Sequence, residues 1–189
     1  IQLVKSQILN PATSFPYWNA GETYFIYDNT DHLPNGINSG GYVLAVGNNR
    51  PVPDDEMKKY ISDASNMNLS VIRIFLNSGW VDLESSGIGN YNSSIMDRID
   101  KIISYAKSER IFVSVNIFHF WEGLKPYLVK YGIVDPSMTT DELIAGDEWQ
   151  EFFSNPGIKN DFKNRINFLL NHENPYTGLK WKDEPSIFS

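Results

Sequence analysis

Polar and aromatic residues follow each of three apolar runs in the sequence, and their types are those that bind carbohydrate. Amide side chains can hydrogen bond to sugar hydroxyls, while aromatic rings stack on the apolar faces of pyranoses. The candidates for substrate binding are Asn48, Asn49, Asn77, Trp80, Asn116 and Trp121, and His119 is the candidate for supporting acid-base chemistry. A structural alternative stays open for each type: packing for the tryptophans, a structural hydrogen bond for Asn116 and a satisfied core histidine for His119.

Arg73 stands in the middle of an apolar run, Ser70 to Leu76, whose composition is typical of a strand covered on both faces. We therefore expect the guanidinium to be buried, and a buried cation without a counter-charge costs several kcal/mol. No carboxylate on the other predicted strands could pair with it, so its partner is expected on chain outside these residues. A functional role for Arg73 and a purely structural salt bridge both stay open.

Several other chemistries are not expected. Gly47-Asn48-Asn49 matches neither the dinucleotide-binding fingerprint nor the phosphate-binding P-loop, so we predict no nucleotide cofactor. Glu122 is the one acidic residue near a strand end, and a single carboxylate does not make a hydrolytic pair. With no cysteine and only three histidines, none of them close together in the sequence, no metal site is expected.

The elements that position these residues alternate between strands and helices. The predicted strands are Tyr42–Val46, Ser70–Leu76 and Ile111–Phe118, the predicted helices are 53–67, 93–106 and 156–170, and Pro185–Ser189 reads as the start of a further strand. A long insertion, residues 121–155, separates the third strand from its helix. This order is typical of right-handed parallel crossovers. We predict an α/β fold in which residues 1–40 form an irregular or β segment and residues 41–189 form the strand-helix units.

The overall composition narrows the possible partners. The 189 residues are 41% hydrophobic and 14% aromatic, which is enough for a globular core. A net charge of −7 argues against a nucleic-acid partner or an anionic membrane surface. The sequence begins at Ile1 and has neither a basic-then-apolar leader nor an apolar run long enough to span a bilayer. A start without Met fits a mature secreted protein, a trimmed tag or a fragment, and the sequence does not choose among them; the localisation that we expect is secreted.

The last part of the sequence resembles glycoside hydrolase family 5, especially its endo-β-mannanase-like members. The matching residues are Glu151-Phe152-Phe153-Ser154-Asn155-Pro156 and the run from Tyr176 to Ile187, together with Arg73 and the run from Val115 to Trp121. The resemblance implies a (β/α)8 TIM barrel, of which this chain would be the N-terminal half with strands 1 to 3, helices 1 to 3 and the start of strand 4.

The same resemblance implies a retaining, endo-acting hydrolase of β-1,4-linked mannan or glucan. Its two catalytic glutamates would lie about 5 Å apart, both beyond residue 189, and Arg73 would hydrogen bond to the nucleophile. The chain alone would then be inactive, and the C-terminal half of the barrel would be its partner. Arg50-Pro51 and Phe75 depart from the mannanase pattern and leave the sugar open. The alternative function is a non-catalytic, carbohydrate-binding half-barrel that covers its sheet edges by self-association.

Overall fold

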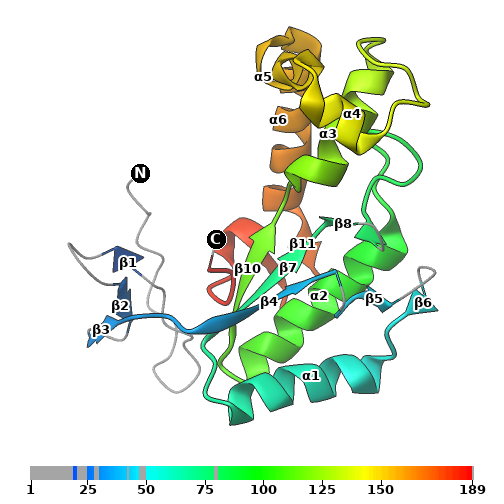
Figure 1. The fold of residues 1–189 in the computed structure, drawn as a ribbon. Coiled ribbons are helices and arrows are strands. Elements are labelled where there is room, and N and C mark those ends of the chain that lie inside the picture. Colours follow the sequence, from blue (N-terminus) through cyan, green and yellow to red (C-terminus); the bar gives the residue numbers. More distant parts are fainter. Residues whose placement is uncertain are drawn as a thin grey trace.

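A three-stranded parallel sheet in the order β10-β7-β4 forms the centre of the molecule (Figure 1). The structure is a computed structural model, and it describes residues 19–20, 25–27, 30–41, 43–46, 50–78 and 81–188. The strands are Gly36–Gly40 (β4), Val71–Phe75 (β7) and Phe112–Asn116 (β10). Ile187 adds an isolated parallel bridge to Val113 on the outer side of β10, at the place where the sequence predicts the start of a further strand. The predicted α/β class is confirmed.

The first strand of the sheet is β4, and the prediction of Tyr42–Val46 as the first strand is wrong. Ala45–Val46 (β5) instead pairs antiparallel with Arg50–Pro51 (β6), and Tyr42 lies outside the described residues. The hydrophobicity of this run reflects burial in a turn, where Leu44 is only 1% exposed. β4 carries little hydrophobic signal because it begins at Gly36, where an added Cβ would lie 2.3 Å from the carbonyl oxygen of Val71. The parallel sheet therefore starts before the predicted boundary at residue 41.

A small antiparallel sheet precedes β4. It consists of Asn19–Ala20 (β1), Phe25–Tyr27 (β2) and Thr30–His32 (β3), in that order. Figure 1 shows it to one side of the parallel sheet, joined to β4 by the stretch after β3.

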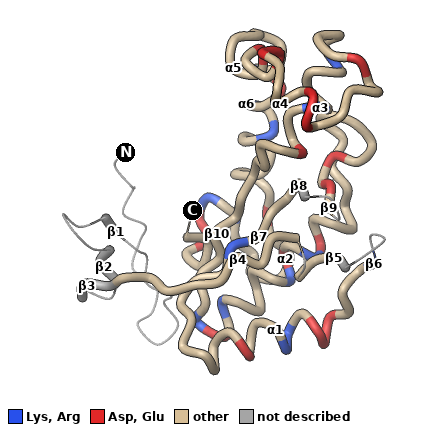
Figure 2. The backbone as a smooth tube through the Cα atoms, in the orientation of Figure 1, with Lys and Arg blue, Asp and Glu red and all other residues tan. Residues whose placement is uncertain are grey.

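Two helices cover one face of the parallel sheet. Asp54–Asn66 (α1) begins with three acidic residues, which the helix dipole favours there, and they are red in Figure 2. Ser93–Ser108 (α2) is capped by the side chain of Asn92, which accepts hydrogen bonds from two backbone N–H groups. Both helices bury an apolar stripe against alternate residues of β7 and β10, and these form one hydrophobic core with Ile72, Ile74, Val113 and Val115.

The predicted insertion 121–155 is helical and has a core of its own. It contains Phe120–Lys130 (α3), Thr140–Ala145 (α4), a 3-10 turn at Glu148–Gln150 (η1) and Glu151–Ser154 (α5). Pro156–Asn171 (α6) follows and packs against them at the top of Figure 1. The residues buried together in this second core are Leu124, Tyr127, Leu128, Val134, Leu143, Phe152 and Ile158.

Short hairpins complete the described chain. Asn77–Ser78 (β8) pairs with Val81–Asp82 (β9), and Glu173–Asn174 (β11) pairs with Leu179–Lys180 (β12). A 3-10 turn at Trp181–Asp183 (η2) then leads to the bridge at Ile187. Among the helices of the described residues, none is long and apolar enough to cross a membrane.

Candidate functional site

Arg73 lies in a row of polar side chains across the sheet, but it is exposed, and the prediction that it is buried is wrong. Asn38, Arg73 and Ser114 are register partners on the three strands. The neighbours of Arg73 along β7, Ile72 and Ile74, are fully buried beneath the helices, so Arg73 points to the opposite face. None of the ion pairs among the described residues includes Arg73, and its guanidinium lies 4.6 Å from the ring centroid of Phe75.

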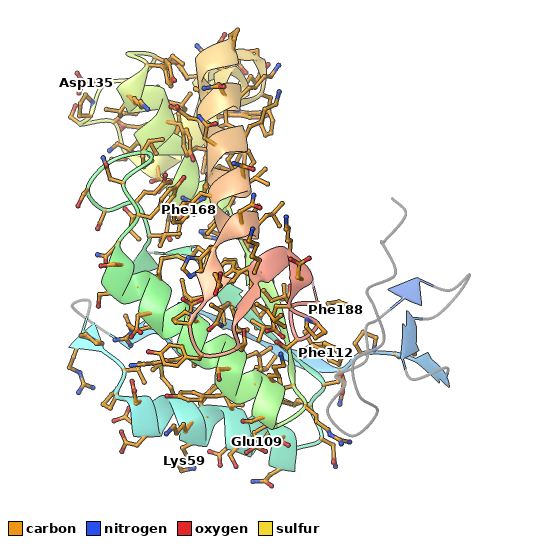
Figure 3. The ribbon with its side chains drawn as sticks, turned by 180° about the vertical axis from the view of Figure 1, so that it is seen from behind. Lys59, Glu109, Phe112, Asp135, Phe168 and Phe188 are labelled. Atoms are coloured by element: carbon orange, nitrogen blue, oxygen red, sulfur yellow. The ribbon has the colours of Figure 1, made fainter. Side chains whose placement is uncertain are left out.

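A hollow of about 290 Å³ opens on this uncovered face of the sheet. Its lining residues are Pro34, Gly36, Ile37, Asn38, Val71, Arg73, Ser114 and Phe188. Phe188 closes one side and stands edge-on to Phe112, with ring centroids 6.4 Å apart, and Figure 3 labels both residues at this end of the sheet. Polar side chains in the middle of the floor and apolar side chains around it give a concave surface that could hold a polar ligand.

His119 and Arg73 come close to the same aromatic ring. The ring of His119 meets that of Phe75 edge-on, with centroids 5.1 Å apart. The guanidinium of Arg73, which is two residues before Phe75 on the same face of β7, lies over the Phe75 ring. The Nδ1 atom of His119 is buried without a hydrogen-bond partner among the described residues and lies 3.5 Å from Oε2 of Glu122. The structure therefore gathers the two predicted catalytic residues around Phe75 at the carboxyl ends of β7 and β10.

The remaining predicted binding residues have different surroundings. Asn77 accepts a hydrogen bond from Arg165 and donates one to Oδ1 of Asp82 at 2.9 Å, so its amide shapes the loop after β7. Asn116 accepts the backbone N–H of Phe118 at 3.0 Å, which fits the structural alternative. Trp121 is 52% exposed at the start of α3. Asn48, Asn49 and Trp80 lie outside the described residues.

Arg165 on α6 is the buried arginine, and the sequence reasoning missed it. Its side chain is 1% exposed and pairs with Glu84, whose side chain is 3% exposed. It also donates to the carbonyl of Ile117 at 3.0 Å and to Asn77. One guanidinium thus joins the loop after β7 to the end of β10. The helical spacing of the sequence does indicate that Arg165 is buried, because it falls on the same side of α6 as Ile158 and Leu169.

Asp100 on α2 is a second buried polar centre, away from the sheet ends. Its carboxylate accepts hydrogen bonds from Trp181 Nε1 at 2.9 Å and contacts His172 Nε2 at 2.7 Å, while its carbonyl accepts from Asn174 at 3.0 Å. Burial raises the pKa of the Asp100 carboxyl above its ordinary value. This network holds the hairpin β11-β12 and η2 against α2.

Glu184 has a similar structural role at the end of that segment. It is buried, accepts the hydroxyl of Ser186 at 2.9 Å and pairs with Lys107 of α2 at 3.0 Å. Two residues of the Tyr176 to Ile187 phrase, Trp181 and Glu184, are therefore fixed by contacts with the helix beneath the sheet. Among the described residues, no group of three or more histidine or acidic side chains could hold a metal ion.

Comparisons with known proteins agree with this arrangement. No family model matches the sequence. Mannan endo-1,4-beta-mannosidase 1 from Oryza sativa is 26% identical over 172 residues, and a putative mannan endo-1,4-beta-mannosidase 4 from Arabidopsis thaliana is 25% identical over 167 residues. The solved endo-1,4-beta-mannanase of Rhizomucor miehei matches 92% of this chain with 26% identity and a TM-score of 0.72. A solved family 5 mannosidase from the same organism has a TM-score of 0.71 with 18% identity.

The resemblance to glycoside hydrolase family 5 is confirmed. The match covers 88% and 87% of this chain but only 38% and 39% of the two curated relatives, and 46% of the Rhizomucor miehei mannanase. The chain thus matches part of a family 5 barrel, and the prediction of a partial barrel is confirmed, although its first strand is Gly36–Gly40 and not the predicted Tyr42–Val46. In this barrel frame the row Asn38, Arg73 and Ser114 faces the barrel interior, and α1, α2 and α6 are outer helices.

Proposed function

We propose that this chain is the N-terminal half of the catalytic barrel of an endo-acting glycoside hydrolase that cleaves β-1,4-linked mannan. The observation that carries the proposal is its match, over 92% of its length, to less than half of a solved endo-1,4-beta-mannanase. The open face with Arg73 supports it, because a barrel interior is covered only when the remaining strands close the ring. Both catalytic glutamates would belong to those strands.

Arg73 is the residue of this chain that would act most directly. An exposed guanidinium at the sheet centre would become enclosed when the barrel closes and would then need a carboxylate partner. A nucleophilic glutamate would supply that charge and would be oriented by the guanidinium. His119, held against Phe75, and the exposed ring of Trp121 would contact the sugar at the strand ends.

Hydrolysis by the complete polypeptide that carries this sequence tests the proposal. We expect it to release reducing ends from soluble β-mannan, and the 189-residue chain alone to release none. Arg73→Ala should lower kcat/KM by about 100- to 1,000-fold, the effect of losing one oriented donor at a catalytic centre. Lys59→Ala, which removes a charge that is 72% exposed on α1, is the matched control and should change nothing. Unchanged turnover in Arg73→Ala would show that this residue is not part of the catalytic site. A complete polypeptide without activity on any β-1,4-linked polymer would overturn the proposal that it is a glycoside hydrolase.

The alternative, a non-catalytic half-barrel that binds carbohydrate as a self-associated pair, is favoured by the open sheet face. The intact mass of the native protein under denaturing conditions separates the two functions. A mass well above 21.6 kDa supports the enzyme, whereas 21.6 kDa alone, with a dimer in gel filtration, supports the pair.

Secretion is part of the proposal for either function, because a polymeric substrate lies outside the cell. Measuring the amount of the protein in the culture medium and in the cell fraction tests it.

A further inference from the structure

Two tripeptides of the sequence match the acceptor pattern for N-linked glycosylation, which is Asn-X-Ser with any residue except proline at X. They are Asn68-Leu69-Ser70 and Asn92-Ser93-Ser94. Such tripeptides also arise by chance, so the surroundings of each asparagine have to decide between them. We propose that Asn68, in the turn between α1 and β7, is an N-glycosylation site of the secreted protein and that Asn92 is not.

The backbone of Asn68 is fixed while its side chain is open. The side chain is exposed and makes no hydrogen bond among the described residues. The backbone N–H donates to the carbonyl of Ser65 at 2.9 Å, and the backbone carbonyl accepts from the side-chain amide of Asn35 at 2.8 Å. The turn therefore presents the amide nitrogen to solvent, and a bulky, hydrated oligosaccharide requires such a surface position.

The backbone conformation explains Asn68 only in part. Its φ is 55°, in the left-handed region, which asparagine tolerates better than most residues. Glycine adopts this conformation at no steric cost, so the turn by itself does not require the side chain of Asn68. Ser70 does have a structural role, because its hydroxyl donates to the carbonyl of Asn35 at 2.9 Å. The evidence for the site therefore comes from the unused amide of Asn68.

The side chain of Asn92 is already used by the fold. It is half-buried, and its oxygen accepts the N–H groups of Ser94 and Ile95 at 3.0 and 3.2 Å, which caps α2. An oligosaccharide on the same amide group would have to leave from a side chain that lies against the first turn of the helix. The two tripeptides thus share a motif but differ in the space around the amide.

Asn68 lies at the end of the molecule opposite to the strand ends. β7 begins at Val71, three residues after Asn68, and the hydroxyl of Ser65 donates to the carbonyl of Glu109 at 3.3 Å. Figure 3 labels Glu109 at the lower end of the molecule and Asp135 at the upper end, where the helical insertion lies. An oligosaccharide on Asn68 would therefore leave the strand-end site open to a polymeric substrate.

The proposal rests on secretion, which is part of the proposed function, through a eukaryotic pathway. The relatives from Oryza sativa, Arabidopsis thaliana and Rhizomucor miehei are eukaryotic proteins. The host cell supplies the donor, an oligosaccharide on a lipid diphosphate carrier. Asn68 Nδ2 gives up a proton to a base of the host transferase and forms a bond to the anomeric carbon of the first sugar. The bond from that carbon to the diphosphate breaks, and the lipid diphosphate leaves.

Glycopeptide mass spectrometry of the complete polypeptide, secreted from yeast behind a secretory leader, tests the site. We expect the peptide with Asn68 to carry a glycan, and peptide-N-glycosidase to remove it while converting Asn68 to aspartate. Asn68→Gly, which keeps the left-handed backbone, and Ser70→Ala, which keeps the asparagine, should each abolish the modification. Asn92→Asp, which retains a capping carboxylate for α2, is the matched control and should leave it unchanged. Thermal melts of each variant separate a lost glycan from a lost fold.

The outcomes also separate this proposal from the proposed function. Hydrolysis of β-mannan by a secreted protein with unmodified Asn68 would overturn the site and leave the enzyme standing. A glycan on Asn68 of a complete polypeptide that hydrolyses no β-1,4-linked polymer would support the site and overturn the enzyme. A glycan on the peptide with Asn92, and none on the peptide with Asn68, would show that the open amide does not select the site and would overturn the proposal.

Discussion

Replacing Arg165 by Met should lower the free energy of unfolding by about 3–5 kcal/mol, the cost of breaking a buried ion pair by removing one partner. Met preserves much of the volume but leaves the carboxylate of Glu84, only 3% exposed, without its cation. The carbonyl of Ile117 also loses a donor at 3.0 Å, and the amide oxygen of Asn77 loses another. Glu84 would keep one hydrogen bond, from the N–H of Gly89 at 2.7 Å, which is too little to solvate a buried charge.

Urea and thermal unfolding measure this loss. For a chain of this size the midpoint temperature falls by roughly 2–4 °C per kcal/mol, so we expect Arg165→Met to melt about 6–20 °C lower. Lys59→Met is the matched control, because the Lys59 and Asp63 pair on α1 is exposed on both sides and contributes at most about 0.5 kcal/mol. The double variant Arg165→Met with Glu84→Gln should be more stable than Arg165→Met, because the orphaned charge is gone while the acceptor for Gly89 remains.

Two results would refute this reasoning. A loss below about 1 kcal/mol in Arg165→Met would mean that water or a neighbour solvates Glu84 without the guanidinium. A double variant no more stable than the single one would mean that the cost comes from lost packing and the Ile117 carbonyl rather than from the buried carboxylate.

Two further substitutions test other parts of the structure. Burial raises the pKa of Asp100, so the folded state binds its proton more tightly than the unfolded state does, and the unmodified protein should lose stability as the pH rises above the ordinary carboxyl pKa. Asp100→Asn removes this proton and should therefore show a smaller loss of stability over the same pH range. Urea unfolding of both proteins across this range checks it, and parallel curves would contradict it. Gly123→Ala should destabilise α3 by about 1–3 kcal/mol despite the better helix propensity of Ala, because the added Cβ would lie 2.8 Å from the Phe118 ring. Asn164→Ala at an exposed position of α6 should instead be neutral or slightly stabilising in the same thermal melts.

The sequence predicted the strands that are rich in apolar residues and missed the features whose signal comes from geometry. β7 and β10 were found because Ile72, Ile74, Val113 and Val115 are covered by helices and because Val71, Phe75 and Phe112 on the other face are apolar as well. β4 was missed because close approach to Val71 requires glycine, and a glycine-rich strand has no hydrophobic pattern. The buried ion pair was missed because Glu84 lies in a loop and Arg165 in a helix, 81 residues apart in the chain.

The two arginines show why an apolar neighbourhood in sequence does not by itself predict burial. Residues around Arg73 are apolar because alternate positions of β7 face the helices, but Arg73 belongs to the face that this part of the chain leaves uncovered. Arg165 lies on the inner side of an outer helix, where α6 covers the loop after β7 and the end of β10. The strand-end edge is therefore held in place by one arginine, which has its counter-charge within this chain. The other, Arg73, has no ion pair among the described residues and lies on the uncovered face of the sheet, where the proposed complete barrel would supply its carboxylate. A cation that stabilised this chain by itself would already be paired, so the unpaired state of Arg73 agrees with the proposed role in a complete barrel better than with a role in the folding of this chain.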